Sequence, residues 1–202
     1  SKGVLCMAKL YFRYGVMGSS KSAQALITKF NYEEQGMRVW LMKPAADTRY
    51  GADKVHSRIG LEQPADVIDD DMDLYEVFRD REREFYDVII VDEAQFLQPA
   101  HVEQLREIVD YYNVPVFCFG LRTDFRTRLF PGSARLFELA DSVTELKTVC
   151  TCGGKAMVNA RIDAEGRVVT EGEQFLLGGN ESYRPMCYKC WKKAALESKS
   201  EK

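Results

Sequence analysis

The strongest constraint on the fold is a run of β-branched apolar residues near the middle of the chain. Residues 88–91 read Val-Ile-Ile-Val without a polar residue between them. A strand with no polar side has to be covered on both faces, which is typical of a parallel sheet between layers of helices. Residues 114–119 have the same character, and residues 143–148 form a further strand candidate.

Helical patterns separate these apolar runs. Residues 9–14 predict a strand that runs into Gly15, residues 22–35 a helix, and residues 37–42 a second strand. Residues 72–84 and a segment opened by Pro99 have amphipathic helical spacing. Strands that alternate with helices predict right-handed βαβ units and a mostly parallel sheet. The polar stretch 43–65 is long for a structureless loop, so we expect a functional or mobile excursion there.

Composition bounds the function classes. The 202 residues fit one domain, or a large domain with a small satellite, and carry a net charge of −3. That acidic balance argues against sequence-independent binding of nucleic acid. No apolar run approaches the roughly 20 residues of a membrane span, and no secretory leader is apparent, so we expect a cytoplasmic protein with no membrane partner.

The segment between the first strand and the first helix has the context of a Walker A loop. Residues 15–22 read Gly-Val-Met-Gly-Ser-Ser-Lys-Ser. In such a loop the backbone N–H groups cradle phosphates, the lysine reaches the β- and γ-phosphates, and the final hydroxyl binds Mg²⁺. The predicted ATP-binding residues here are Gly15, Met17, Gly18, Ser19, Ser20, Lys21 and Ser22. Ser20 departs from the usual glycine, and its Cβ could crowd the phosphates; a polar turn without nucleotide is the alternative.

Two carboxylates follow the central apolar strand in the manner of a Walker B element. Asp92, at the carboxyl end of that strand, is predicted to hold Mg²⁺ near Ser22. Glu93 projects one residue further, where a base could take a proton from an attacking hydroxyl. A solvated helix cap is the alternative, but both elements occur in the order that a P-loop fold requires.

The cysteines predict a structural metal site. Cys150 and Cys152 form one close pair, and Cys187 and Cys190 form another. Two such pairs that bracket a predicted hairpin at residues 155–169 would present four thiolates to Zn²⁺. A closed four-thiolate site is structural, and it would stabilise a lobe too small to fold on its own core. Elsewhere, Cys118 is expected in the core and His101 at the surface.

The predicted fold class is therefore α/β, with a P-loop parallel sheet flanked by helices and a small zinc-ribbon-like β lobe at the C-terminus. We expect the P-loop domain to cover residues 7–148 and the zinc lobe residues 149–194. Residues 1–6 are expected to be a non-native or disordered leader, and residues 195–202 a disordered tail.

With these elements in place, the chain resembles the type II, zinc-containing thymidine kinases, bacterial branch, along nearly its whole length. The matching motifs are residues 15–22, Asp47-Thr48-Arg49-Tyr50, Asp92-Glu93-Ala94-Gln95-Phe96, residues 120–126, and Gly178-Gly179-Asn180-Glu181 with Tyr183. The resemblance implies transfer of phosphate from ATP to the 5′-hydroxyl of deoxythymidine, which gives dTMP.

The resemblance also implies roles for individual residues. Glu93 would be the general base, and Asp47 and Arg49 would lie near the transferred phosphate. Phe96 and Phe125 would sandwich the base. The other residues expected at the nucleoside are Met17, Gln95, Leu121, Gly178, Gly179 and Tyr183. A pocket beside the thymine methyl rewards that methyl by only about 1–3 kcal/mol, so deoxyuridine should be accepted. The family further implies a homotetramer and feedback inhibition by dTTP.

Two rival interpretations remain open at this stage. The first is a catalytically impaired nucleotide-binding protein in which Ser20 blocks the phosphates, although such a protein would not need the carboxylate of Glu93. The second is a kinase of the same fold that acts on another deoxynucleoside. A zinc-ribbon nucleic-acid module is disfavoured because the chain lacks a basic, aromatic-studded stripe.

Overall fold

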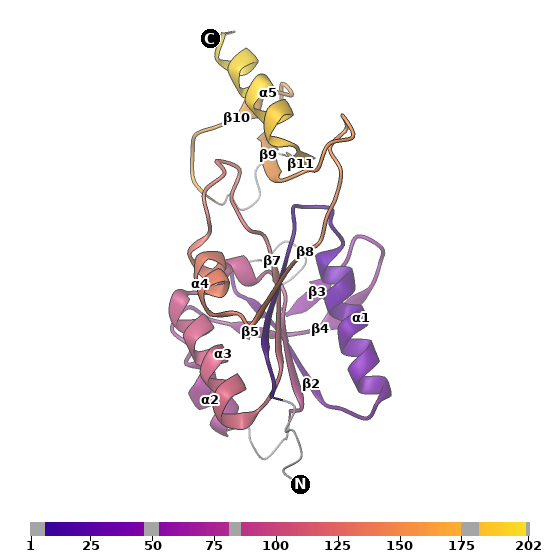
Figure 1. Cartoon of the computed structure of the whole chain (residues 1–202), viewed down its shortest axis with the longest axis vertical. Helices are drawn as coiled ribbons and strands as arrows, with labels where there is room; N and C mark the ends of the chain where they lie inside the picture. The colour runs from indigo at the N-terminus through magenta and orange to yellow at the C-terminus, as the bar shows by residue number, and fades with distance from the viewer. Residues whose placement is uncertain (1–6, 47–52, 81–85, 175–181, 201–202) are drawn as a thin grey trace.

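A six-stranded parallel sheet forms the centre of the molecule (Figure 1). The structure is a computed structural model, and it describes residues 7–46, 53–80, 86–174 and 182–200. The strands run in the order β5-β2-β6-β7-β1-β8, and every pairing between them is parallel. Their bounds are β1 Leu10–Tyr14, β2 Val39–Pro44, β5 Asp66–Ile68, β6 Val88–Val91, β7 Val116–Gly120 and β8 Ser142–Glu145. The predicted α/β class is confirmed.

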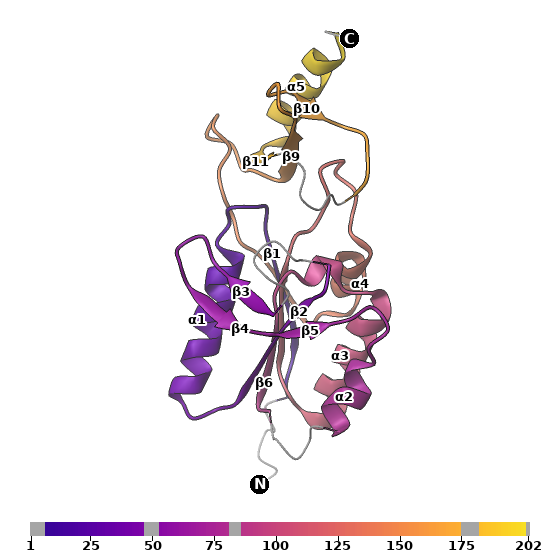
Figure 2. The same ribbon diagram turned by 180° about the vertical axis from the view of Figure 1, so that it is seen from behind.

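Helices cover both faces of this sheet, as the apolar strands require. α1 (Lys21–Glu34) lies on one face beside a short hairpin of β3 (Lys54–His56) and β4 (Glu62–Pro64). α2 (Leu74–Asp80), α3 (Pro99–Tyr112) and α4 (Pro131–Leu139) cover the other face, which the reverse view shows clearly (Figure 2). The sheet is thus a buried middle layer, and its strand ends are the places where side chains can form a site.

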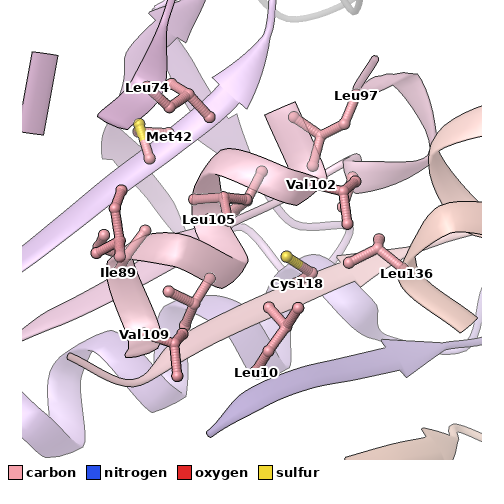
Figure 3. Packing of buried hydrophobic residues seen from close by; sticks show 14 of the residues in the cluster. Leu10, Met42, Leu74, Ile89, Leu97, Val102, Leu105, Val109, Cys118 and Leu136 are labelled. Atoms are coloured by element: carbon pink, nitrogen blue, oxygen red, sulfur yellow. The ribbon is translucent and has the colours of Figure 1, made fainter. Parts of the chain in front are cut away.

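Alternation along each strand divides the core into two clusters. Ile89 and Val91 of β6 point toward α2, α3 and α4, while Val88 and Ile90 point toward α1. Figure 3 shows the larger cluster, in which Leu105 of α3 packs over these strands. Cys118 is fully buried in that cluster, as predicted, and burial raises its thiol pKa far above the ordinary value. Both faces of the strands are therefore consumed by packing.

A second, smaller unit stands beyond the carboxyl ends of the large sheet (Figure 1). It contains an antiparallel sheet in the order β10-β9-β11, formed by β9 (Val158–Ile162), β10 (Val168–Val169) and β11 (Ser182–Met186). α5 (Tyr188–Ser200) packs on it through Ala195, and Ala160, Ile162 and Val168 complete this small core. The expected hairpin between the cysteine pairs is present as β9 and β10.

Several expectations need correction. The tail was predicted to be disordered from residue 195, but α5 continues to Ser200 because Ala195 is buried in the small core. The excursion at 43–65 contains the β3–β4 hairpin, and α4 was not foreseen. Of the helix predicted at 72–84, α2 covers Leu74–Asp80, and residues 81–85 lie outside the described part.

His101 is buried, not on the surface as predicted. It lies in the first turn of α3, where its Nδ1 accepts the Gln98 backbone N–H at 3.2 Å, and its Nε2 lies 3.0 Å from the Met72 carbonyl oxygen. The side chain caps the helix and ties it to the segment before α2. The apolar periodicity of α3 cannot predict this burial, because the contacts of His101 with Gln98 and Met72 depend on how the segment before α2 packs against the helix. Burial lowers its pKa, which favours the neutral ring.

No helix in the described ranges is long and apolar enough to cross a membrane.

Candidate active site

The predicted site residues meet where β1, β6 and β7 end. β7 lies between β6 and β1, so the segment after Gly120 separates the loop after β1 from Asp92 and Glu93 after β6. The backbone N–H of Gly15 donates to the carbonyl of Gly120 at 3.2 Å and joins the loop after β1 to the segment after β7. Because ligands of open parallel sheets bind outside the carboxyl ends of the strands, this edge is the place to look for chemistry.

The loop from Gly15 to Ser20 has the close packing of a phosphate-binding turn. A Cβ on Gly15 would lie 2.4 Å from Ser19 Oγ and 2.6 Å from the Leu146 carbonyl oxygen, so only glycine fits there. Lys21 opens α1, and its Nζ donates to the Val16 carbonyl at 2.8 Å and to Ser19 Oγ at 3.2 Å. The lysine thus folds back across the loop, within reach of a phosphate held there.

Ser20 adopts the backbone conformation that glycine would supply. Its φ of 64° and ψ of 23° lie in the left-handed region, and its side chain is exposed. Ser20 thus occupies a conformation that glycine adopts freely and that costs an L-residue about 1–2 kcal/mol. Its side chain makes no capping hydrogen bond to α1, so the hydroxyl is not needed for the helix to begin.

A cavity of about 330 Å³ opens above this loop. Its wall includes Lys21, Ser22 and Glu93, and the turn between β3 and β4 closes the opposite side. Arg58, in that turn, places its Nη1 3.8 Å from where a Cβ on Gly18 would stand. Arg58 could not be predicted from the sequence, because the stretch 43–65 shows no periodicity that would predict a hairpin over the loop.

Asp92 is buried at the end of β6, between Glu93 and the phosphate loop. Burial, together with the nearby Glu93 carboxylate, raises the Asp92 pKa to about 7, although a hydrogen bond with Ser22 and the charge of Lys21 oppose the rise. A buried carboxylate beside a serine hydroxyl fits a divalent cation, whose charge would favour the ionised form. Asp92 and Ser22 thus form a suitable pair of oxygen ligands.

Glu93 is held in position by the residue two places further on. The Gln95 amide donates through Nε2 to Glu93 Oε2 at 2.5 Å and accepts the Leu121 backbone N–H at Oε1, at 3.0 Å. Glu93 itself has a φ of 50°, again in the left-handed region. Gly120 makes room for this arrangement, since a Cβ there would lie 2.8 Å from Gln95 Oε1. The left-handed backbone of Glu93 and the buried Gln95 amide together fix the orientation of the carboxylate.

A second, narrow cleft of about 20 Å³ adjoins the first. It brings together six residues expected at the nucleoside, which are Met17, Gln95, Phe96, Leu121, Phe125 and Tyr183. It also contains Thr123 and Asp124, from the matching motif at residues 120–126, and three residues that no sequence motif indicated, which are Phe130, Asn159 and Gln174. Gly178, Gly179, Asp47 and Arg49 lie outside the described residues.

Arg161 on β9 organises one side of this cleft. The side chain is 1% exposed, and its guanidinium carbon stands 3.6 Å above the centre of the Phe125 ring. Its Nε donates to the Tyr183 hydroxyl at 3.0 Å. Arg161 thus covers one face of Phe125, which is itself 1% exposed, and the Arg126 guanidinium carbon lies 5.7 Å from the centre of the same ring. Phe96 packs edge-on against Phe130. A buried arginine on a strand of the second lobe has no signature in the sequence alone.

The four paired cysteines converge in the second lobe. Their sulfur atoms all lie within 4.8 Å of one another, and Cys152 Sγ lies 3.7 Å from Cys187 Sγ. Sulfurs bound tetrahedrally at about 2.3 Å stand about 3.8 Å apart, so the donor set fits Zn²⁺. Backbone N–H groups of Cys152 and Cys187 lower the Cys150 pKa to about 6, whereas hydrogen bonds with the Cys187 and Cys152 side chains raise the Cys190 pKa, so binding of Zn²⁺ would release protons from the cluster.

Comparison with known proteins decides the family. The family model described as thymidine kinase matches residues 8–191 of this chain. The chain belongs to the thymidine kinase family. Phosphorylation of thymidine is accordingly its activity.

Individual thymidine kinases match over nearly their full length. The enzyme of Salmonella paratyphi A is 46% identical over 192 residues, which cover 95% of this chain and 94% of that protein. The enzyme of Enterobacteria phage T4 is 48% identical over 187 residues, 92% of this chain and 96% of that protein. Among solved structures, a Pif1 helicase from Candida albicans aligns with a TM-score of 0.39 and 16% identity, over 72% of this chain and 37% of that one.

Proposed function

We propose that this thymidine kinase transfers the γ-phosphate of ATP to the 5′-hydroxyl of deoxythymidine by in-line attack, with Glu93 as general base. The observation that carries the proposal is the contact between the two cavities. Met17 and Leu121 line both, and Glu93 lies in the wall of the larger one together with Lys21. A phosphate over the loop and a nucleoside in the cleft would therefore meet beside a carboxylate.

The larger cavity supplies the groups that phosphoryl transfer uses. Lys21 would contact the β- and γ-phosphates, and the backbone from Gly15 to Ser20 would surround them. Ser22 and Asp92 would hold Mg²⁺, which offsets charge on the phosphates. Asp47 and Arg49 are proposed to approach the transferred group from their segment of the chain. Arg58 adds a further cation at the wall of the same cavity.

The role of Glu93 follows from how it is held. Gln95 fixes one carboxylate oxygen, so the carboxylate keeps one orientation. A base within hydrogen-bond reach of the attacking hydroxyl accelerates transfer by about 10²–10⁴-fold. Phe125, with Arg161 behind it, and Phe96 would position the base of the nucleoside, and Tyr183 would close the cleft.

The remaining elements of the proposal concern the setting of the enzyme. The cysteine cluster would hold a structural Zn²⁺ that stabilises the second lobe. Gly178 and Gly179 are proposed to contact the nucleoside. Resemblance to the family supports a homotetramer, feedback inhibition by dTTP, and a cytoplasmic location. Of the rival functions, an inactive nucleotide binder is disfavoured because Ser20 keeps the loop path of glycine.

Conversion of radiolabelled deoxythymidine to its monophosphate tests the proposal, with Mg²⁺-ATP and zinc-replete protein. The parent protein should turn over, and Glu93→Gln should lose about 10²–10⁴-fold in kcat while it still binds ATP. Gln keeps the shape of Glu93 and removes only the base. A Glu93→Gln variant with unchanged kcat would refute the assignment of the base. Preference for another deoxynucleoside in the same assay would replace deoxythymidine as the substrate.

A further inference from the structure

The inner face of β9 carries two buried polar side chains, which is unusual for a strand in so small a lobe. Asn159 and Arg161 are 2% and 1% exposed, and they alternate with Ala160 and Ile162, which pack into the small core beneath α5. Side chains two residues apart share one face of a strand. One face of β9 therefore serves the stability of the lobe, and the other faces the active site.

Asn159 makes hydrogen bonds to two loops of the other domain. Its Oδ1 accepts the backbone N–H of Met17, in the phosphate loop, at 2.7 Å. Its Nδ2 donates to the carbonyl of Thr123, after β7, at 3.1 Å. One amide thus ties β9 to the segment after β1 and to the segment after β7. Loss of this amide would leave a backbone donor and a backbone acceptor without their partners in a largely buried place.

A second contact joins the phosphate loop to the cysteine cluster itself. Val16, the residue before Met17, is 7% exposed and packs with Cys150 and Ala156. Cys187 and Cys190 also contact this group. Two consecutive residues of the phosphate loop are therefore held by the second lobe, one through its side chain and one through its backbone N–H.

We propose that Asn159 is a positioning residue that fixes the phosphate loop in its ATP-binding geometry, so that the cysteine-bearing lobe contributes to binding of ATP as well as of the nucleoside. A Walker A loop binds phosphate through backbone N–H groups whose directions have to be set in advance. Here Asn159 and the packing of Val16 set the start of that loop from outside its own domain. The inference rests on the proposed binding of ATP by this loop.

The test measures affinity for Mg²⁺-ATP in the absence of nucleoside, with Asn159→Leu and a matched control. Leu has the same number and branching of side-chain heavy atoms as Asn, although its methyl groups are bulkier, and it makes neither hydrogen bond. In the control, Gln104→Leu, the lost amide oxygen accepts the Leu74 backbone N–H at 2.9 Å, far from the phosphate loop. We expect Asn159→Leu to weaken ATP binding about tenfold, and Gln104→Leu to leave it unchanged.

The outcomes separate this inference from the proposed function. If the parent protein binds ATP and Asn159→Leu binds it equally well, the inference is overturned while the proposed function stands. An effect of Asn159→Leu on the KM for thymidine alone would also overturn it, because Asn159 would then act only as part of the nucleoside cleft. If the parent fails to bind ATP, the proposed function fails first.

A second measurement does not depend on how well the Asn159 variant folds. Hydrogen exchange of the parent protein is followed by mass spectrometry before and after removal of metal with a chelator. We expect peptides that contain residues 15–22 to exchange faster after chelation, while peptides from α3 stay protected. Equal exchange of the loop peptides in both states, or loss of protection in α3 to the same degree, would overturn the coupling between lobe and loop.

Discussion

Replacement of Ser20 by glycine tests whether this phosphate loop is strained or blocked. Ser20 has a φ of 64°, where an L-residue is less stable than glycine by about 1–2 kcal/mol. Glycine also raises the conformational entropy of the unfolded chain, which lowers the free energy of unfolding by about 0.4–1 kcal/mol. The Ser20 hydroxyl accepts no capping hydrogen bond from a backbone N–H of α1, so none is lost. Ser20→Gly should therefore stabilise the protein by about 1 kcal/mol.

Thermal unfolding and steady-state kinetics measure the two sides of this prediction. A gain of about 1 kcal/mol raises the melting temperature by about 2–4 °C in a domain of this size. The kcat/KM for ATP should stay within about twofold, because the loop path is already that of glycine. Thr127→Gly is the matched control, since Thr127 also has a positive φ, of 65°, and lies in a turn away from the phosphate cavity. Thr127→Gly should raise the melting temperature without any effect on kcat/KM for ATP.

Crowding of the phosphates by Ser20 would give a different result. If the Cβ of Ser20 crowded the phosphates, Ser20→Gly would raise kcat/KM for ATP tenfold for every 1.4 kcal/mol of repulsion removed. A tenfold rise in kcat/KM with no change in melting temperature would therefore mean that the serine blocks the site and that the left-handed backbone costs nothing here.

Three further predictions concern the nucleoside side of the site. Gly120→Ala would place a Cβ 2.8 Å from Gln95 Oε1 and displace the amide that orients Glu93. The kcat should therefore fall at least tenfold in steady-state assays. An unchanged kcat would mean that Gln95 does not orient the proposed base. Arg161→Leu removes the cation 3.6 Å above Phe125 and the hydrogen-bond donor to the Tyr183 hydroxyl. The KM for thymidine should therefore rise about tenfold, and the KM for ATP should not change. Arg161→Lys should not restore the KM for thymidine. Deoxyuridine should be phosphorylated with kcat/KM lower by about 10–200-fold, and its complete rejection would contradict a pocket that senses the methyl only through apolar contact.

The parts of the fold with a periodic signal could be predicted from the sequence. The run of β-branched residues at 88–91 allows few arrangements other than a doubly covered strand, and the phosphate loop and Asp92 follow strands at their carboxyl ends as such motifs require. The cysteine cluster was equally predictable, because paired cysteines that bracket a hairpin have few other uses.

The contacts between the two lobes could not be predicted in this way. Asn159 and Arg161 are single polar residues in a short strand, and their roles depend on how β9 is placed against the loops after β1 and β7. Tertiary placement also buried His101 and extended α5 through the expected tail. In each case a long-range contact outweighed a local pattern that indicated solvent.

The backbone at the turns that carry Ser20 and Glu93 is strained for a reason that lies in the fold. Within the described part of the chain, four residues other than glycine have positive φ, and two of them are Ser20 and Glu93. Each comes soon after a buried parallel strand, where the chain has to change direction within a few residues while its side chains or N–H groups face the carboxyl edge. A left-handed residue makes that change in one step, at a cost of about 1–3 kcal/mol that the surrounding packing sustains. Ser20 sets the direction of the phosphate loop, and Glu93 sets the direction of the proposed base. Replacement of Glu93 by a glycine would relieve the strain but should lower activity, because it also removes the carboxylate side chain. Replacement of Ser20 by glycine removes no side chain with a proposed role in the reaction.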